Sequence, residues 1–276
     1  MFAARFAFQS PAAPAAVNAR RAGTASTNSA TTYTAYTVTN NTAQTDTDRF
    51  KFGSSSMLLP KIASGAGQPY NSYIQATGGT RNWMDFGTGE FTVEWWQYIE
   101  SPLSTHSNGT ELLGLDQTSG GFAIRLAQEY GTNGLGGTVP RYISVFARGQ
   151  VDLDYWTLPA DWATNTWIFC VVQRKGTTMS CWVDGVLLTR SDGPNGSAAT
   201  RNFASGTNIK IGTVDGSAGM APGNLDEFCV SNTYRYSDTG ANIPVPTAAF
   251  TLDSYTTQLM HFEGADGGTT FENTLS

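Results

Sequence analysis

Short runs of β-forming residues, separated by turn residues, fill the chain from about residue 50 onward and restrict its fold more than any other feature. Val, Ile, Phe, Tyr, Trp and Thr are frequent within the runs, while Gly, Asn, Asp and Ser lie between them. No helix longer than about two turns is indicated. The expected strands are residues 54–60, 90–100, 109–116, 121–128, 141–148, 166–174, 178–190, 208–213 and 225–232. So many short strands imply two sheets, and the chain is predicted to be an all-β antiparallel sandwich.

Two turns are the best defined local elements. Residues 174–177 read Arg-Lys-Gly-Thr and lie between two alternating runs, which predicts a β-hairpin. Asp184 and Gly185 form a second turn, after which a new run starts at Val186. These turns set where the chain reverses direction between residues 166 and 190.

The run from 90 to 100 shows how side chains should divide between the two faces of a sheet. Because side chains alternate along a strand, Phe91, Val93 and Trp95 are expected on the face that builds the core. The opposite face carries Thr92, Glu94, Trp96 and Tyr98, and it either meets a further layer or binds a ligand. Three large aromatic side chains on other strands are also expected in the core, namely Trp167, Trp182 and Phe228.

The length of the chain indicates how many domains it can form, and its charge and hydropathy argue against nucleic acid and membranes as partners. A chain of 276 residues that is 40% hydrophobic can form one large core plus a tail. Arg5, Arg20 and Arg21 are the only charged residues before Asp46, so residues 1–45 carry +3 and the remainder −9 of the net charge of −6. An acidic body without a basic stripe is a poor nucleic-acid binder, and no apolar run reaches the roughly 18 residues that span a bilayer. We therefore expect neither nucleic acid nor a membrane as a partner.

Residues 1–48 differ in composition from the rest of the chain. They are rich in Ala, Thr, Ser and Asn and show little periodicity, which is typical of a segment that becomes ordered only against a partner. Arg5 and the residues Gln9-Ser10-Pro11 interrupt the apolar start, so a cleaved leader is not expected. The predicted organisation is an extended N-terminal arm, residues 1–48, followed by a single domain with a closing C-terminal segment, residues 49–276.

The three cysteines, Cys170, Cys181 and Cys229, have neither CxxC nor zinc-ligand spacing. They are interpreted as buried small apolar residues in a reduced compartment. Cys170 and Cys181 could face each other across the predicted hairpin, so a disulfide between them stays open.

Four sequence blocks carry a family resemblance, namely FGTGEFTVEWW, NTWIFCVVQRKGTTMSCWVDG, IKIGTVDG and GNLDEFCVSN. Their order and spacing resemble those of laminin-G-like jelly rolls over about residues 50–236. The resemblance implies a two-sheet antiparallel jelly-roll sandwich of the concanavalin A-like lectin/glucanase type. It also implies that Asp226 and Glu227 are the family's structural acidic pair. Because this fold hosts lectins, glycosidases, adhesion modules and virion proteins, it does not by itself assign a function.

The C-terminal stretch YRYSDTGANIPVPTAAFTLDSYTTQLMHFEGADGGTTF resembles the linker and closing strand of tailed-phage tail and capsid accessory proteins that carry such jelly rolls. In tandem versions, the piece similar to HFEGADGGTTF continues into a segment similar to residues 36–56. The two ends of this chain are therefore expected to pair, within the chain or across a subunit interface.

The second resemblance implies a non-catalytic phage virion protein, either a capsid decoration protein or a tail component, which is located in the virion. Its expected partners are other virion proteins of the capsid or tail. Assembly into a homo-oligomer, for example a trimer, would give multivalent attachment through symmetric packing.

No catalytic residue is predicted. Glycoside hydrolysis needs two carboxylates about 5 to 9.5 Å apart, and the ExDxxE-like run of the related laminarinase-type enzymes is absent. Only two histidines are present, His106 and His261, and no GxSxG elbow occurs, so a nucleophilic triad is not indicated. The tight acidic sets are Glu94, Glu111 with Asp116, Asp152 with Asp154, and Asp226 with Glu227. Since none has the required spacing, the chain is predicted not to be an enzyme.

The residues that could form metal or sugar sites have simpler explanations. Four aspartates in or near loops could offer oxygen ligands to calcium, namely Asp152, Asp154, Asp215 and Asp226. Solvated turn residues explain them more simply, so no metal site and no cofactor is assigned. Sugars stack on exposed aromatic rings, and the candidate platforms are Trp96, Tyr98, Tyr142, Tyr155 and Trp156. Core or interface packing explains these rings too, so a surface glycan is retained as a partner without assigned binding residues.

Two functions other than a virion protein stay open. One is a polysaccharide depolymerase of the glycosidase type. The other is a secreted lectin or adhesin, for which Asn108 and Asn195 would be glycosylation acceptors in a eukaryotic secretory setting.

Overall fold

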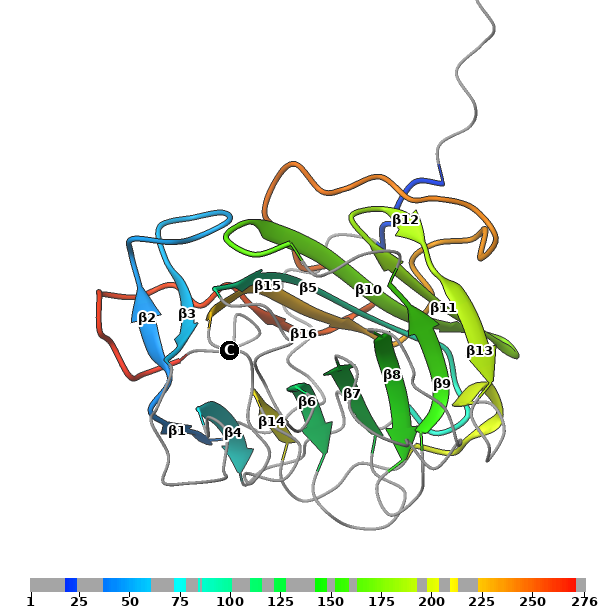
Figure 1. The fold of residues 1–276 in the computed structure, drawn as a ribbon, viewed down its shortest axis with the longest axis horizontal. Helices are drawn as coiled ribbons and strands as arrows, with labels where there is room; N and C mark the ends of the chain where they lie inside the picture. Colours follow the sequence, from blue (N-terminus) through cyan, green and yellow to red (C-terminus); the bar gives the residue numbers. More distant parts are fainter. Residues whose placement is uncertain are drawn as a thin grey trace, which may run out of the picture.

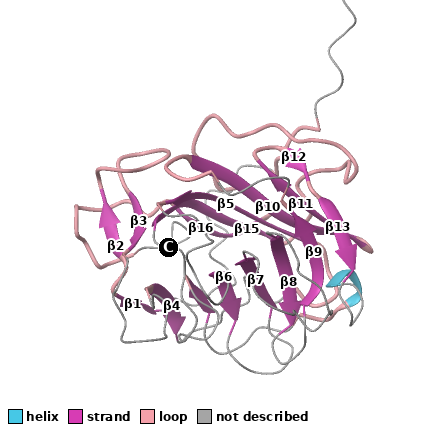
Figure 2. Cartoon of the chain, viewed as in Figure 1, coloured by secondary structure: helices cyan, strands magenta, loops and turns pink. Residues whose placement is uncertain are grey.

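The structure, a computed structural model, describes residues 18–23, 37–60, 72–77, 84, 86–100, 110–115, 122–127, 142–147, 152–158, 163–192, 198–203, 209–212 and 223–271. Within these residues the chain forms two eight-stranded antiparallel sheets that face each other (Figure 1). No α-helix occurs in these ranges, and their helical element is a short 3-10 turn at Ala198–Thr200 (Figure 2). Accordingly, no described helix is long and apolar enough to cross a bilayer. The predicted all-β sandwich is confirmed.

The first sheet has the strand order β1-β4-β14-β6-β7-β8-β9-β13. Its strands are β1 Thr37–Asn41, β4 Tyr73–Thr77, β6 Thr110–Leu115, β7 Phe122–Ala127, β8 Tyr142–Ala147, β9 Asp152–Thr157, β13 Thr189–Asp192 and β14 Ile209–Ile211.

The second sheet has the order β12-β11-β10-β5-β15-β3-β2, and β16 also pairs with β15. Its strands are β2 Gln44–Asp46, β3 Ser56–Leu59, β5 Phe91–Ile99, β10 Trp167–Lys175, β11 Thr178–Val183, β12 Val186–Leu187, β15 Gly223–Ser231 and β16 Thr256–Met260. Along one side β15 pairs with β5; along the other it pairs first with β3 and then with β16. The change of partner falls at a β-bulge between Asp226 and Cys229 in the pairing with β5.

The main core lies between the two sheets and follows the predicted alternation. On β5, Phe91, Val93 and Trp95 are fully buried and belong to the same apolar cluster as Ile143 and Trp156 of the first sheet. This confirms which face of β5 builds the core.

A second apolar layer covers the outer face of the second sheet. Residues 232–255, here called the cover segment, run across this face and are drawn in orange above β10 and β11 in Figure 1. Tyr236 and Phe250 of the cover segment pack with Trp96, Phe169 and Trp182 of the strands. The second sheet is therefore buried on both faces over most of its width.

All nine predicted strands are present, with the run 178–190 divided among β11, β12 and β13. The hairpin turn is confirmed by Gly176 at φ +55°, and the turn after β11 by Asp184 at φ +46° and Gly185 at φ +78°. Glycine is required at 185, because a Cβ atom there would lie 2.3 Å from the Ile243 carbonyl oxygen of the cover segment. Cys170, Cys181 and Cys229 are buried and free, so no disulfide joins Cys170 to Cys181.

The N-terminal residues are placed differently from the extended arm expected for residues 1–48. β1 belongs to the first sheet and β2 to the second, so residues 37–46 are part of the sandwich. The physical reason is burial: Ala43 and Thr45 are almost completely enclosed, although the composition of this segment gives little sign of a core strand.

The predicted pairing of the two chain ends occurs within the chain. The Thr45 backbone N–H donates to the Gly268 carbonyl at 2.8 Å, and the Gly267 N–H donates to the Thr45 carbonyl at 2.8 Å. Phe262 and Phe271 pack edge to face beside them, with ring centroids 6.1 Å apart. The C-terminal segment thus closes the sandwich against β2.

Candidate functional site on the outer face of the second sheet

The register of β5, β10 and β15 sets four rows of side chains on the outer face of the second sheet. In order along β5 these rows are Thr92–Gln173–Ser231, Glu94–Val171–Cys229, Trp96–Phe169–Asp226 and Tyr98–Trp167–Asn224. The side chains of the first three rows are buried, whereas Tyr98 and Trp167 of the fourth row are half-buried. This face therefore holds both a packed interface and a partly exposed rim.

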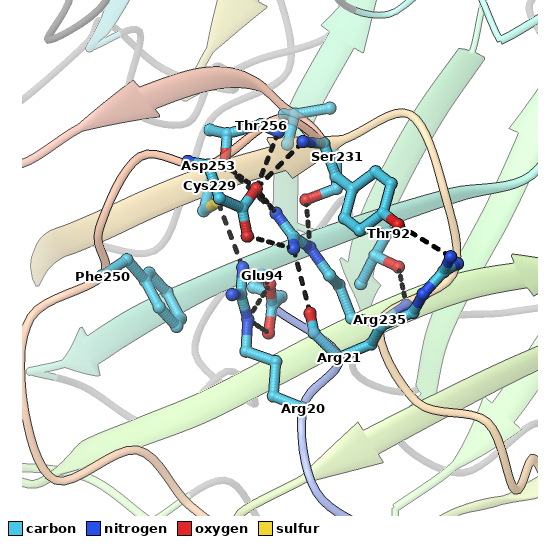
Figure 3. Close-up of polar contacts among 12 residues, drawn as sticks. Arg20, Arg21, Thr92, Glu94, Cys229, Ser231, Arg235, Phe250, Asp253 and Thr256 are labelled. Carbon is cyan, nitrogen blue, oxygen red and sulfur yellow. Dashed lines mark hydrogen bonds and ion pairs between the residues drawn. The ribbon is translucent and has the colours of Figure 1, made fainter. Parts of the chain in front are cut away.

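Residues 18–23 are here called the N-terminal strip. The strip contacts the second row through the side chain of Arg20, which binds Glu94. The Arg20 guanidinium binds both carboxylate oxygens of Glu94, with Nε–O distances of 3.1 and 2.9 Å and an Nη2–O distance of 2.8 Å (Figure 3). Glu94 is completely buried and also accepts a hydrogen bond from the Tyr236 hydroxyl at 2.8 Å. Burial alone would lower the pKa of Arg20, but the Glu94 charge raises it above the ordinary value. Arg20 is therefore positively charged where it binds Glu94.

A second arginine, Arg235 of the cover segment, is buried beside the first. Its guanidinium binds both oxygens of Asp253 at 2.5 and 2.7 Å, and it also donates to Ser231 and Thr256 (Figure 3). It donates to the Arg21 carbonyl at 3.0 Å, which ties the N-terminal strip to the cover segment. Burial alone would raise the pKa of Asp253, but the Arg235 and backbone hydrogen bonds hold it well below the ordinary value.

The first row anchors the start of the cover segment by hydrogen bonds. The Gln173 side-chain oxygen accepts from the backbone N–H groups of Arg235 and Tyr236 at 2.8 and 2.9 Å, and its amide donates to the Tyr236 carbonyl at 2.8 Å. The Thr92 hydroxyl donates to the Thr233 carbonyl at 2.9 Å. Polar side chains on this covered face thus satisfy the backbone of the segment that crosses them.

The acidic pair at the β15 bulge holds two further segments. Asp226 accepts from the backbone N–H groups of Lys51 and Phe52 at 2.8 and 3.1 Å. Glu227, at φ +52°, accepts from the Phe250 N–H at 2.6 Å and contacts His261 Nδ1 at 2.6 Å.

Burial raises the pKa of Asp226 to about 7, although the backbone hydrogen bonds oppose this shift. The hydrogen bond with Glu227 raises the pKa of His261. Both acidic residues act as anchors for the backbone, in accord with the structural pair that the resemblance implied.

The fourth row forms an aromatic rim, defined by Arg49, Tyr98, Glu100, Asn165 and Trp167. Tyr98 and Trp167 are half-buried and meet edge to face, with ring centroids 5.6 Å apart. The Arg49 guanidinium lies 4.5 Å from the centre of the Tyr98 ring and forms a 2.6 Å ion pair with the exposed Glu100. The Tyr98 hydroxyl is 3.5 Å from the exposed Asn165 amide oxygen. The rim thus combines partly exposed rings with charged and amide groups.

The predicted sugar platforms are distributed unevenly. Trp96, Tyr142, Tyr155 and Trp156 are at least nine-tenths buried and offer no open ring face. Tyr98 is the one candidate that remains partly exposed. Sequence reasoning missed Trp167 as its partner, because it was expected in the core together with Trp182 and Phe228. The latter two are buried as predicted, whereas Trp167 at the start of β10 is only half-buried and packs against the outer apolar cluster.

The acidic and histidine candidates have other partners where the structure describes them. Glu94 binds Arg20, Asp226 binds backbone N–H groups, and Asp154 is buried in a 2.6 Å ion pair with Arg190. Four further residues lie outside the described part, in whole or in their side chains: His106, Glu111, Asp116 and Asp215; the Asp152 side chain does as well. Within the described ranges, no group of three or more His, Cys, Asp or Glu side chains could hold a metal ion.

Residues 64–239 match the family described as the concanavalin A-like lectin/glucanases superfamily. This match spans more than half of the chain, which therefore belongs to that superfamily. No curated protein matches the chain.

Solved structures with a similar fold come from several sources. A proposed carbohydrate binding protein from Bacteroides ovatus is 15% identical with a TM-score of 0.46, over 87% of this chain and 55% of that one. Domain 4 of AbnA, an extracellular arabinanase from Geobacillus stearothermophilus solved with arabinotriose, is 15% identical with a TM-score of 0.45. The match covers 75% of this chain and 85% of that one. A SAP-like pentraxin from Limulus polyphemus is 12% identical with a TM-score of 0.43, and the match covers 78% of this chain and 93% of that one. The chain thus spans about half the length of the Bacteroides protein.

Proposed function

We propose that this chain is a non-catalytic recognition module that binds glycans at the aromatic rim. The observation that supports this proposal is the partly exposed pair of Tyr98 and Trp167, which lies beside Arg49, Glu100 and Asn165. Sugar rings present C–H groups that pack on aromatic faces and hydroxyl groups that bind charged and amide side chains. The rim offers both kinds of contact on one surface.

Binding without hydrolysis is the mechanism that fits the acidic groups at the rim. A glycosidase needs one protonated carboxyl and one free carboxylate on either side of the sugar bond. At the rim, Glu100 is paired with Arg49, and next to it Asp46 accepts a 2.8 Å hydrogen bond from Asn224, which itself contacts Arg49. Both acidic groups are therefore engaged with the protein, in accord with a role in positioning Arg49 and Asn224.

The first prediction is that Trp167→Ala and Tyr98→Ala each weaken polysaccharide binding about tenfold or more, which corresponds to about 1.4 kcal/mol. Retardation in gels that contain bacterial surface polysaccharides measures this affinity, and the same incubation should release no reducing ends. Tyr234→Ala is the matched control, because Tyr234 is a half-buried tyrosine that lies under Arg21 and Lys175. Unchanged retardation for both rim variants, with any polysaccharide the parent binds, would rule out the rim as the binding site.

We further propose that the module is carried on a phage virion, as a capsid decoration protein or tail component. The resemblance of residues 234–271 to such proteins supports this role. Asn18 and Arg20 hold the N-terminal strip on the body, and the sequence before the strip contains Phe2, Phe6 and Phe8 as candidate apolar anchors.

The second prediction concerns this anchor. Deleting residues 2–16 should leave the sandwich folded but lower its occupancy on particles that lack the protein, as measured by co-sedimentation. The deletion must end before Asn18, because removal of residues 2–45 would also remove Arg20, β1 and most of β2. Replacing Phe2, Phe6 and Phe8 by serine is a milder version with the same expected direction. Retention equal to that of the parent would place the attachment on the body instead.

A further inference from the structure

The N-terminal strip lies on the second sheet in the manner of a bound peptide. The Asn18 amide donates to the Asp238 carbonyl at 2.7 Å, and its oxygen accepts from the Asp238 N–H at 3.2 Å. The Arg21 N–H donates to the Arg235 carbonyl at 2.6 Å, and the Gly23 N–H donates to Asp253 at 2.9 Å. Ala19 and Ala22 are exposed between these contacts. Backbone contacts therefore hold the strip along its length, while Arg20 points into the body.

The pocket that receives Arg20 is specific for a guanidinium group. Glu94 supplies both carboxylate oxygens, the Phe250 ring centre lies 5.0 Å from the guanidinium carbon, and Cys229 Sγ lies 3.7 Å from Nη2. A flat, forked cation matches this combination of carboxylate and ring better than a lysine does. Because Glu94 is completely buried, an empty pocket would leave a carboxylate without its counter-charge. Binding of a guanidinium group in the pocket is therefore strongly favoured over an empty pocket.

The strip contacts the second sheet directly, but its covalent connection runs to the edge of the other sheet. Its described hydrogen bonds, ion pairs and ring contacts are with β5, β15 and residues 233–255. Thirteen residues, 24–36, separate Gly23 from the start of β1 at Thr37, which lies at the edge of the other sheet. The contacts that recognise the strip do not depend on which chain supplies it.

We propose that the pocket around Glu94 is a docking site for residues 18–23 of a second copy of this chain, so that exchanged strips link neighbouring subunits. The strip carries the charge that the buried Glu94 requires, and an identical copy carries an identical strip. A linker of 13 residues gives the strip of the same chain an effective concentration in the millimolar range. The strip of a second copy must compete with this effective concentration. Exchange therefore occurs where copies are crowded on one surface, or where the strip of the same chain cannot fill the pocket. This inference is independent of glycan binding.

Two full-length variants test the exchange directly. Arg20→Ala retains the pocket but lacks the side chain that fills it, whereas Glu94→Ala retains the strip but lacks the pocket. Each alone should sediment as the smaller species, while an equimolar mixture at tens of micromolar should form a 1:1 complex in analytical ultracentrifugation. The matched control mixes Arg20→Ala with the double variant Arg20→Ala/Glu94→Ala, which offers no intact strip and should form no complex. A mixture that sediments like its separate components, with both variants folded by circular dichroism, would overturn the proposal.

A second measurement covers the case in which either variant fails to fold. A protease site placed between residues 24 and 36 of the parent allows the folded chain to be cut, and a fluorescent peptide of residues 14–25 is then added. The labelled peptide should replace the cut strip, and a peptide with Arg20→Ala should bind roughly 30-fold more weakly or worse, as expected for loss of one partner of a buried charge pair. Absence of exchange over days, or equal binding of the two peptides, would show that the strip is a fixed part of its own chain.

Discussion

Replacing Arg235 by leucine should lower the free energy of unfolding by about 3 to 5 kcal/mol. Arg235 is completely buried and binds both oxygens of Asp253, together with Ser231, Thr256 and the Arg21 carbonyl. Leucine preserves much of the side-chain volume but leaves Asp253 buried without its counter-charge. Urea denaturation followed by tryptophan fluorescence measures this change.

Arg49→Leu is the matched control for this prediction. Arg49 also forms a 2.6 Å ion pair, with Glu100, but about a third of each side chain is exposed to solvent. Exposed pairs contribute roughly 0 to 1 kcal/mol, so this variant should unfold close to the parent. The double variant Arg235→Leu/Asp253→Leu should recover part of the loss, because it leaves no buried charge unpaired. Similar losses for Arg235→Leu and Arg49→Leu would contradict the assignment of Arg235 as a buried charge anchor.

Trp95→Ala should have an effect of similar size, about 3 to 5 kcal/mol, because it removes a large side chain from the main core. Trp95 is completely buried between the sheets, in the cluster that contains Phe91 and Trp156. A cavity of this size cannot close when both walls are hydrogen-bonded sheets. The midpoint of urea denaturation should fall while the transition remains cooperative.

Trp167→Ala provides the contrast, with an expected loss of roughly 1 kcal/mol. Trp167 is half-buried at the start of β10, so its removal exposes little core and creates no closed cavity. The sequence alone would predict a loss as large as that of Trp95→Ala, because both tryptophans lie in strongly apolar runs. Equal losses for the two variants would place Trp167 in the core after all.

The two sheets were predictable because each strand carries its own pattern. The alternation in residues 91–99 separates the core face from the outer face correctly, since a strand needs only its own side chains to show which face is apolar. The same holds for the turn at Asp184 and Gly185, whose conformation depends on local residue types. The family resemblance then supplied the order in which such strands assemble.

The strands that were missed lack this local pattern. β9 begins with Asp152 and contains Asp154, residues that are uncommon in strands, and Asp154 forms a buried ion pair with Arg190 of β13. β2 is three residues long and gains its place from contacts with β3 and the C-terminal segment. Contacts with distant residues decide these elements, so a reading of each segment by itself cannot find them.

The candidate site depends even more on distant residues. Arg20 and Glu94 are 74 positions apart, and Tyr98 and Trp167 are 69 positions apart. Sequence reasoning found Tyr98 because its side-chain direction follows from the strand. It did not find that Trp167 would be only half-buried, because the burial of this side chain depends on segments distant in the sequence.

The position of β15 has a consequence for the synthesis of this protein. β15 lies beside β5 in the middle of the second sheet, and it pairs residues as far apart in the sequence as Thr92 and Ser231. While the ribosome is still adding residues before Gly223, β5 has only β10 as a partner, and the aromatic side chains of Trp96 and Phe169 have no cover. Folding that waits for such distant pairs is slow and leaves apolar surface open to aggregation. A nascent chain that stalls before residue 223 therefore contains neither the centre strand nor the covering layer, and we expect it to bind chaperones through its uncovered aromatic side chains.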